Sequence, residues 1–399
     1  MTTPVRADGL RPRTPAYRRA LLALFGTGLA TFALLYMVQP LLALVAAQFS
    51  VGATEASLLL SVPTAAIALA VLPLARLSEL LGRARVMGLG LAVAAVAGLA
   101  LAAAPGWPAL LALRAVQGVA LAGVPAAALA WVAEEIHPSA VTRVGGLYIA
   151  GTTVGGMAGR LLGGVAADVW GWRGAVLLVS ALAALAAAAG LWLLPAATRR
   201  PPGGAPATAG ATGRRAARVR AYLVGGLGMA MFVGVFNVVV FRTTGAPYDL
   251  GAAAASSFFL TYLAGTFTSA LAGRLTGRVG LRWAVLIGLA GCAVGLAVTL
   301  AEPLALVWLG LLLVAAGFFL AHAVASSTAP RLAERPSAAS ARYTLAYYLG
   351  SSAGGVLLGQ AWERAAWGGA VLAGLALLVA AGLAAAGLPG RRVATRGRG

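Results

Sequence analysis

Two arginines, Arg114 and Arg160, lie inside long apolar stretches of the sequence. Gln117 follows Arg114 by three residues, a spacing that puts both side chains on one face of a helix. An arginine at the centre of a membrane costs at least about 2.5–3.5 kcal/mol, so each should face a wet cavity or a polar partner rather than lipid. Arg114 can therefore line a cavity or brace backbone carbonyl groups. Arg160 can contact a substrate or hold the fold.

Four further polar residues interrupt apolar stretches: Tyr36, Gln39, Asn237 and His322. Tyr36 and Gln39 share a helix face by their spacing, and Pro40 weakens the helix beside them because proline has no N–H to donate. His322 is the only intramembrane side chain whose ordinary pKa lies near physiological pH, so it is the candidate proton carrier. The structural alternatives are a packed, hydrogen-bonded histidine and a packed or interfacial tyrosine.

The ten acidic residues divide equally between the predicted cytoplasmic side and the opposite side, and none falls at mid-membrane. Two buried arginines without a buried carboxylate would give a cavity of positive potential, which favours an anionic or strongly hydrogen-bonding molecule over a cationic one. The sequence has no HExxH motif, no nucleotide-binding glycine loop, no paired carboxylates and no cysteine nucleophile with a plausible base. These absences disfavour an enzyme and an ATP-driven pump.

The elements that must position these residues are long apolar segments. Of 399 residues, 61% are hydrophobic and only 10% are charged, and the mean hydropathy is +0.90. A soluble protein has roughly 25% charged residues. The much lower charged fraction of this chain excludes a cytosolic enzyme. Because a helix needs about 20 apolar residues to cross a bilayer, twelve transmembrane helices are predicted, at about 20–47, 54–75, 86–104, 108–132, 143–166, 173–194, 220–241, 253–273, 283–300, 303–327, 341–361 and 366–388.

The basic residues, 30 in number and all arginine, predict the orientation of the chain. With a cytoplasmic N-terminus, 25 of them fall in cytoplasmic segments and only Arg173, Arg242 and Arg364 fall on the opposite side. Arginines gather on the cytoplasmic side of membrane proteins. The net charge of +20 is therefore a topology signal and not a nucleic-acid surface, and both termini are expected in the cytoplasm.

The stretch between Pro195 and Arg220 is the one long interior segment without apolar character. We interpret residues 195–219 as a flexible cytoplasmic linker, with a reach of roughly 25–30 Å. It joins an N-terminal six-helix bundle (20–194) to a C-terminal six-helix bundle (220–388). A cytoplasmic arm (1–19) and a cytoplasmic tail (389–399) complete the chain. The predicted fold is an all-α polytopic membrane protein with two pseudo-symmetric bundles.

An internal repeat supports this division. The pattern Y-x-x-G-x-x-x-G-G begins at Tyr148 in the fifth segment and again at Tyr347 in the eleventh, 199 residues later. After the second segment, R-L-S-x-x-x-G begins at Arg76, and R-L-T-x-x-x-G begins at Arg274 after the eighth, 198 residues later. Two matches at nearly one offset, in corresponding elements, predict duplicated halves.

These features resemble the major facilitator superfamily of secondary transporters over roughly residues 18–388. The loop after the second segment is similar to the family motif G-x-x-x-D-R-x-G-R-R: Gly82 and Arg83 match, and Glu79 stands where Asp is usual. The segment R-A-V-Q-G, from Arg114, matches the family's R-x-x-Q-G motif in helix four. The resemblance implies the twelve-helix fold and transport by alternating access.

The fifth segment resembles the antiporter motif G-x-x-x-G-P-x-x-G-G, beginning at Gly151, with Gly156 in place of proline and Arg160 in place of the last glycine. The segments 36–42, 133–138 and 318–322 resemble the bacterial drug- and sugar-efflux permease branch. The resemblance implies efflux of a small organic solute, with a proton as coupling ion, across the bacterial inner membrane.

The resemblance also implies roles for particular residues. Helices one, four, seven and ten line the family's central cavity, so the cavity candidates, with Arg160 added from helix five, are Tyr36, Gln39, Arg114, Gln117, Arg160, Asn237 and His322. Glu79 and Arg83, four residues apart beside Gly82, would form a latch that holds the cytoplasmic side closed. A solvated ion pair worth under about 1 kcal/mol is the alternative for these two residues.

A bare ridge runs along the fifth segment, where Gly151, Gly155, Gly159 and Gly163 recur every four residues. Such a ridge lets a neighbouring helix approach closely. The resemblance implies that this face meets the eleventh helix, where Gly350 and Gly354 supply a similar surface, and that the interface seals one side during transport. Close packing without a transport role is the alternative.

Other functions remain open at this point. The chain could import small organic anions, or it could be a membrane receptor or assembly subunit that keeps the fold without moving a solute. The expected partners are a small-molecule substrate, a proton and the lipid bilayer, and a monomer is expected. One cysteine, Cys292, and two histidines far apart in sequence offer no metal site, and no cofactor is expected.

Overall fold

The computed structural model describes residues 9–196 and 214–389. Most of the predicted linker, the first residues of the predicted arm and nearly all of the predicted tail lie outside these ranges. Within them the regular structure is helical, apart from one isolated bridge between Leu10 and Ile136.

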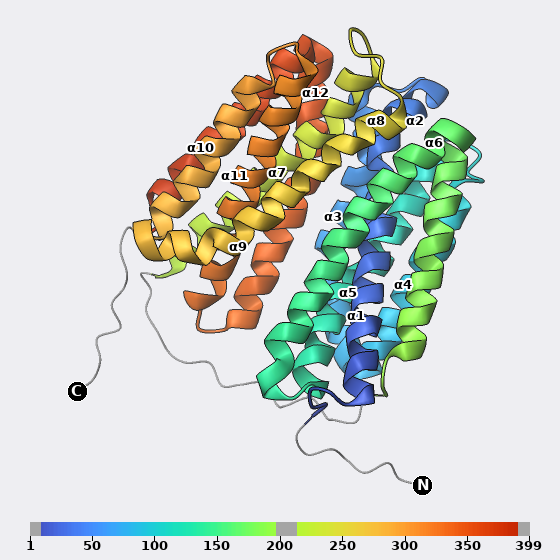
Figure 1. Ribbon diagram of the computed structural model, residues 1–399, viewed down its shortest axis with the longest axis vertical. Helices are drawn as coiled ribbons and strands as arrows, with labels where there is room; N and C mark the ends of the chain where they lie inside the picture. Colours follow the sequence, from blue (N-terminus) through green and yellow to red (C-terminus); the bar gives the residue numbers. More distant parts are fainter. Residues whose placement is uncertain (1–8, 197–213, 390–399) are drawn as a thin grey trace. The chain divides into compact units, whose positions relative to one another are not determined.

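The helices follow one another with short connections (Figure 1). In chain order they are α1 (Pro15–Tyr36), η1 (Gln39–Leu41), α2 (Leu42–Phe49), α3 (Ala53–Leu81), α4 (Arg83–Leu101), α5 (Trp107–Glu135), η2 (Pro138–Ala140), α6 (Val141–Leu193), α7 (Arg214–Thr244), α8 (Ala252–Ser256), η3 (Ser257–Thr261), α9 (Tyr262–Val279), α10 (Leu281–Val298), α11 (Leu304–Arg331) and α12 (Pro336–Ala386).

Nine helices among the described residues are long and apolar enough to cross a membrane. Two of them contain a break in helical geometry, α6 at Gly171 and α12 at Ala365 and Ala366. Each therefore supplies two of the predicted spans. The continuous run of α8, η3 and α9 supplies one more. The described helices thus account for the twelve predicted segments.

Two helices begin earlier than predicted. The first begins at Pro15 rather than at residue 20, because the Thr14 hydroxyl oxygen accepts a hydrogen bond from the Tyr17 N–H and Pro15 fits the first helical turn. The seventh predicted span is part of α7, which begins at Arg214. The predicted arm and linker are therefore shorter than expected, since capping and arginine-rich turns extend a helix beyond its apolar part.

The chain divides into two compact units with the same internal plan. In unit 1, α1 packs against α6 and α4 packs against α5; in unit 2, α7 packs against α12 and α10 packs against α11. Gly82 and Gly280 precede α4 and α10 with φ of 97° and 86°, a backbone region that favours glycine. The sequence repeat is therefore also a structural repeat.

The units depart from the predicted bundles at two short segments. Residues Val51–Ser61, which include the start of α3, belong to unit 2, and Leu250–Ser257 belong to unit 1. In unit 2, the Glu363 carboxylate accepts hydrogen bonds from the Thr54 N–H (2.9 Å) and hydroxyl (2.6 Å). In unit 1, the Asp168 carboxylate accepts from the N–H groups of Ala252 (2.8 Å) and Ala253 (3.0 Å). Each carboxylate caps the N-terminus of a helix.

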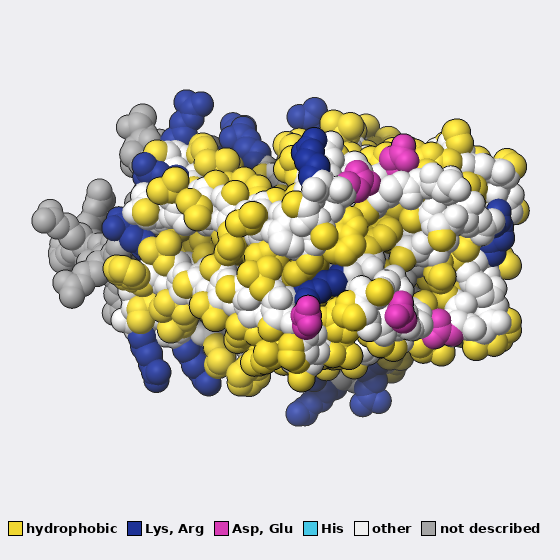
Figure 2. Space-filling view, turned by 90° about the horizontal axis from the view of Figure 1, so that it is seen from above, with side chains coloured by type: hydrophobic (Ala, Val, Ile, Leu, Met, Phe, Trp, Pro, Cys, Tyr) yellow, Lys and Arg dark blue, Asp and Glu magenta, His cyan; other side chains and the backbone are white. Residues whose placement is uncertain are grey.

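Large apolar side chains are exposed along the helices, including Leu69, Leu80 and Trp192. Figure 2 shows a face on which apolar side chains prevail and arginines project as separate groups. Apolar exposure on this scale indicates that the helices are surrounded by lipid.

Candidate functional site

The first polar site, here called the Arg160 cluster, consists of Tyr36, Gln39, Gly156 and Arg160. The Arg160 side chain is buried and donates from Nε to the Gln39 Oε1 (2.7 Å) and from Nη1 to the carbonyl oxygen of Gly156 (2.7 Å). Its guanidinium carbon lies 4.0 Å from the centre of the Tyr36 ring, a cation–π geometry. The cluster thus holds a cation among neutral partners within the membrane-spanning part of unit 1.

A break in the first span positions Gln39. The helix α1 ends at Tyr36, and η1 carries Pro40, which has no N–H to continue the hydrogen-bond ladder. The sequence predicts this weakening. Gln39 follows the end of α1 and is completely buried, and its side chain reaches α6 rather than continuing along a helix face.

The second arginine, Arg114, has a different environment. It is completely buried and donates to the carbonyl oxygens of Leu34 (3.1 Å) and Leu35 (2.7 Å) in α1, and to the side-chain oxygen of Gln117. Gln117 in turn donates to the carbonyl oxygen of Ala94 (3.0 Å) in α4. This is the geometry of a brace that ties α5 to α1 and α4.

The second polar site, here called the Asn237 cluster, lies in unit 2 and consists of Ser57, Ser61, Asn237 and Gly355. Asn237 is completely buried in α7. A Cβ atom on Gly355 would lie 2.5 Å from the Ser61 Oγ and 3.1 Å from the Asn237 Nδ2. The glycine therefore leaves the space that these polar side chains occupy.

The two clusters occupy corresponding places in the repeat. Asn237 follows Gln39 by 198 residues and Gly355 follows Gly156 by 199, the same offsets as the sequence repeat. A Cβ atom on Gly156 would lie 3.2 Å from the Arg160 Nη1, just as one on Gly355 would meet polar atoms. Each unit thus places a polar side chain beside the second glycine of its Gly-Gly pair.

His322 on α11 lies in an aromatic environment in unit 2. Its Nδ1 is 2.9 Å from the hydroxyl oxygen of Tyr343 on α12. Its ring stacks on Phe318, with ring centres 5.6 Å apart, and lies 4.9 Å from the ring of Tyr347. The histidine is half-buried, and its ring and hydroxyl contacts are with Phe318, Tyr343 and Tyr347 rather than with the Asn237 cluster.

The glycine ridge of α6 meets a different helix from the one expected. Cβ atoms on Gly151 and Gly155 would overlap the backbone of Phe25 and Leu29, and one on Gly159 would lie 2.8 Å from the Ala33 backbone. The ridge therefore packs against α1, and the expectation that it meets the eleventh helix is wrong. The physical reason is that the backbone of α1 already fills the space that the missing side chains leave.

The eleventh helix shows the same arrangement. Cβ atoms on Gly350 and Gly354 would overlap the backbone of Gly226 and Ala230 in α7. Both ridges thus hold the first and fifth helices of their own unit together.

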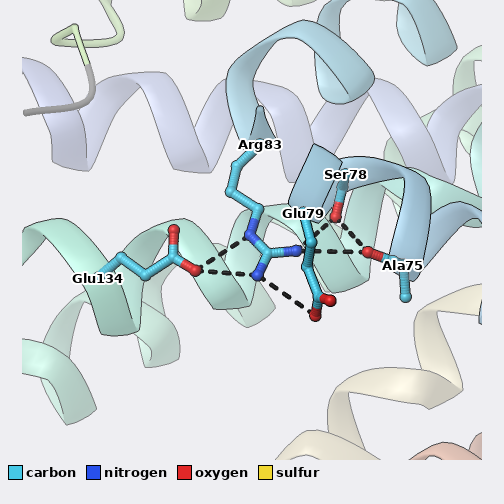
Figure 3. Close-up of polar contacts among 5 residues, drawn as sticks. All are labelled: Ala75, Ser78, Glu79, Arg83 and Glu134. Atoms are coloured by element: carbon cyan, nitrogen blue, oxygen red, sulfur yellow. Dashed lines mark hydrogen bonds and ion pairs between the residues drawn. The ribbon is translucent and has the colours of Figure 1, made fainter. Parts of the chain in front are cut away.

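The predicted latch has a larger set of partners than Glu79 alone. Figure 3 shows the Arg83 guanidinium between Glu134 on one side and Ser78 and Ala75 on the other. It donates to the Glu134 Oε1 from Nε (3.1 Å) and Nη2 (2.9 Å), and from Nη1 to the Ser78 hydroxyl (2.6 Å). The exposed Glu79 carboxylate is 3.6 Å from Nη2. Glu134 is therefore the main partner of Arg83.

Sequence reasoning missed Glu134, Tyr343 and the two serines of the Asn237 cluster. Glu134 and Tyr343 are 51 and 21 residues from their partners, so helical spacing could not pair them. A signal did exist for Ser57 and Ser61, which are four residues apart and share a helix face in an apolar segment.

Comparison with known proteins identifies the family. A family model described as Major Facilitator Superfamily matches residues 21–355. The chain belongs to the Major Facilitator Superfamily. Among relatives, it is 39% identical over 356 residues to the inner membrane transport protein YnfM of Escherichia coli, covering 88% of this chain and 85% of that protein. It is 35% identical over 361 residues to the uncharacterized MFS-type transporter YybF of Bacillus subtilis, covering 88% of this chain and 89% of that protein.

Solved structures agree on the fold. The chain resembles the crystal structure of a bacterial homolog to the human lysosomal transporter Spinster, with a TM-score of 0.73, 17% identity and coverage of 94% of this chain and 96% of that one. This major facilitator protein is therefore a multi-pass membrane transporter with the all-helical fold that the sequence predicts.

Proposed function

We propose that this major facilitator protein exports a small organic anion, or a solute with several hydrogen-bond acceptors, in exchange for protons. The Arg160 cluster carries the proposal. A guanidinium held by an amide, a carbonyl group and an aromatic ring can donate charge-assisted hydrogen bonds to an anionic group of a solute.

The distribution of acidic residues supports an anionic substrate. Every carboxylate that the structure describes lies near a helix end, in a connecting segment or within three residues of a helix break. Asp168 and Glu363, which precede the two breaks, are engaged in capping α8 and α3. The membrane interior of unit 1 therefore has positive potential, which disfavours a cationic drug.

His322 and Tyr343 support proton coupling. A histidine beside a hydroxyl group can accept a proton and pass it on without a buried carboxylate. The resemblance of the first and fifth helices to efflux permeases supports export, and YnfM, the named relative, is an inner membrane protein. Import of the same anion through the same site is the alternative direction.

Thermal unfolding of the purified protein with a panel of organic anions, sugars and hydrophobic amines tests the substrate class, because a ligand of the folded state raises its apparent stability. We expect stabilisation by an organic anion and at least about ten-fold weaker binding after Arg160→Gln, since a charge-assisted hydrogen bond is lost. Arg160→Lys should be intermediate because it keeps the charge but not the planar fork. The exposed arginine variant Arg76→Gln is the control.

Stabilisation only by amines, or equal affinity in Arg160→Gln and Arg76→Gln, would show that the Arg160 cluster does not select the substrate. The direction of transport follows from uptake of the stabilising compound into inside-out and right-side-out vesicles under an imposed pH gradient. Accumulation driven only in right-side-out vesicles would establish import.

A further inference from the structure

A groove of about 480 Å³ lies on the surface of unit 1 between α3, α4 and α5. Its walls consist only of apolar residues and one glycine, among them Leu77 and Leu81 of α3, Leu89 of α4 and Val116 of α5. Its volume is that of a medium-sized ligand pocket.

The groove opens outward. Leu89 is 62% exposed and Val116 is 48% exposed, although both line the groove. The three helices are membrane-spanning segments, so the groove faces the hydrocarbon of the bilayer rather than water. A flexible hydrocarbon chain is the molecule that such a groove is built to hold.

One end of the groove carries positive charge. Arg85 lies one helical turn before Leu89 on the same face of α4, it is exposed, and no other residue described by the structure forms a hydrogen bond or ion pair with it. The same end contains the start of α4, where Gly82 supplies no side-chain cap for the first N–H groups. An uncapped helix N-terminus beside an arginine attracts an anion.

The neighbouring charges do not neutralise this end. Arg83 is already bound by Glu134 and Ser78 (Figure 3). Glu79 is two residues from both Leu77 and Leu81, so it lies on another face of α3, and its carboxylate contacts Arg83. Arg85 thus remains as the cation at the mouth of the groove.

We propose that this groove binds an anionic phospholipid. One acyl chain lies along the groove, and the phosphate contacts Arg85 and the N-terminus of α4. Basic sites beside membrane-spanning helices bind anionic head groups, and apolar burial of the chain supplies the rest of the affinity. The site shares no residue with the Arg160 or Asn237 clusters and does not depend on the proposed substrate.

Lipid binding to the full-length protein in detergent tests this proposal. The protein is titrated with dioleoyl phosphatidylglycerol or dioleoyl phosphatidylcholine, and bound lipid is counted by native mass spectrometry alongside thermal unfolding. We expect tighter retention of phosphatidylglycerol, and about five-fold weaker retention in Arg85→Gln. Arg76→Gln, which removes another exposed arginine near the same end, should retain phosphatidylglycerol as the parent does. Equal retention in the two variants would overturn the proposal.

The groove itself is tested by filling it. Val116→Trp should displace phosphatidylglycerol, whereas Val165→Trp, at an exposed position on α6, should not. Unchanged retention in Val116→Trp would show that no acyl chain lies there. Competition by glycerol 3-phosphate would show a simple phosphate site and also contradict the proposal. If Val116→Trp fails to fold, the comparison of Arg85→Gln with Arg76→Gln decides the question.

Discussion

At the scale of single residues, burial decides which of two possible ion pairs matters. Arg83 is close to Glu79 in sequence, but Glu79 is exposed and 3.6 Å away, whereas Glu134 accepts two hydrogen bonds and is largely buried. Water screens the exposed pair, and the energy of such pairs is small. The largely buried pair is screened less by water, so the loss of a partner costs more.

The first prediction compares the two acids. Glu134→Gln should lower the free energy of unfolding by about 2 kcal/mol, because the largely buried Arg83 guanidinium loses a charged acceptor. Glu79→Gln should change it by less than about 0.5 kcal/mol. Unfolding by SDS in mixed micelles measures both. A larger loss in Glu79→Gln would mean that the exposed carboxylate is the main partner in solution.

The second prediction concerns His322. His322→Gln should abolish solute movement driven by a pH gradient in proteoliposomes while preserving solute exchange at equal pH, because exchange needs the binding site but no net proton transfer. Tyr343→Phe should reduce the driven rate alone, since it removes only the hydroxyl that contacts the histidine. Unchanged driven transport in His322→Gln would exclude the histidine as proton carrier.

Sequence reasoning reached the polar residues but not all of their partners. Arg160, Gln39, Asn237 and His322 stand out because a polar side chain in an apolar span is costly. The hydrogen bonds of Arg114 to two carbonyl oxygens of α1 could be predicted only as an alternative. A sequence does not show which backbone carbonyl groups accept hydrogen bonds from a side chain. Glu134 and Tyr343 were missed because tertiary packing, not helical spacing, brings them to their partners.

At the scale of elements, two neighbouring glycines in α6 face different parts of the structure. Gly155 faces the backbone of α1, where no side chain fits, and Gly156 faces the guanidinium of Arg160. The sequence predicts the ridge from its four-residue spacing. It does not predict which helix fills the ridge, because α1 and the eleventh helix are equally apolar in sequence.

The third prediction tests this packing. Gly155→Ala should lower the free energy of unfolding by about 1–3 kcal/mol, because the added methyl group overlaps the Leu29 backbone and forces α1 and α6 apart. Gly146→Ala, also in α6, has open space at the added methyl group. Gly146→Ala should raise the free energy of unfolding by about 0.5 kcal/mol, because alanine lowers the conformational entropy of the unfolded chain. Equal effects in SDS unfolding would show that the ridge is not tightly packed.

Element boundaries were predicted less well than element types. The apolar spans follow from length and hydropathy, because about twenty consecutive apolar residues are typical of a membrane-spanning helix. The starts of α1 and α7 extend into polar residues that a hydropathy criterion excludes, and Thr14 shows that the cap fixes such a boundary. Residues 51–61 belong to unit 2 and residues 250–257 belong to unit 1, and in each case a carboxylate distant in sequence caps the helix that begins there. No local sequence pattern predicts such a cap.

At the scale of the whole molecule, the arginines predict which end of each span is cytoplasmic. The connections after α10 and after α11 lie at opposite ends of α11, and each carries one exposed glutamate, Glu302 and Glu334. The arginine distribution places Glu302 outside and Glu334 inside. These two positions therefore report the orientation of the chain.

The fourth prediction uses single cysteines at these positions. In spheroplasts, Glu302→Cys should react with a membrane-impermeant maleimide, and Glu334→Cys should react only after lysis, because the bilayer excludes the reagent from the cytoplasmic side. The native Cys292 is completely buried in α10, so the parent protein should remain unlabelled in intact spheroplasts and serves as the control. Labelling of Glu334→Cys without lysis, with protection of Glu302→Cys, would invert the topology and with it the cytoplasmic placement of the Arg83–Glu134 pair.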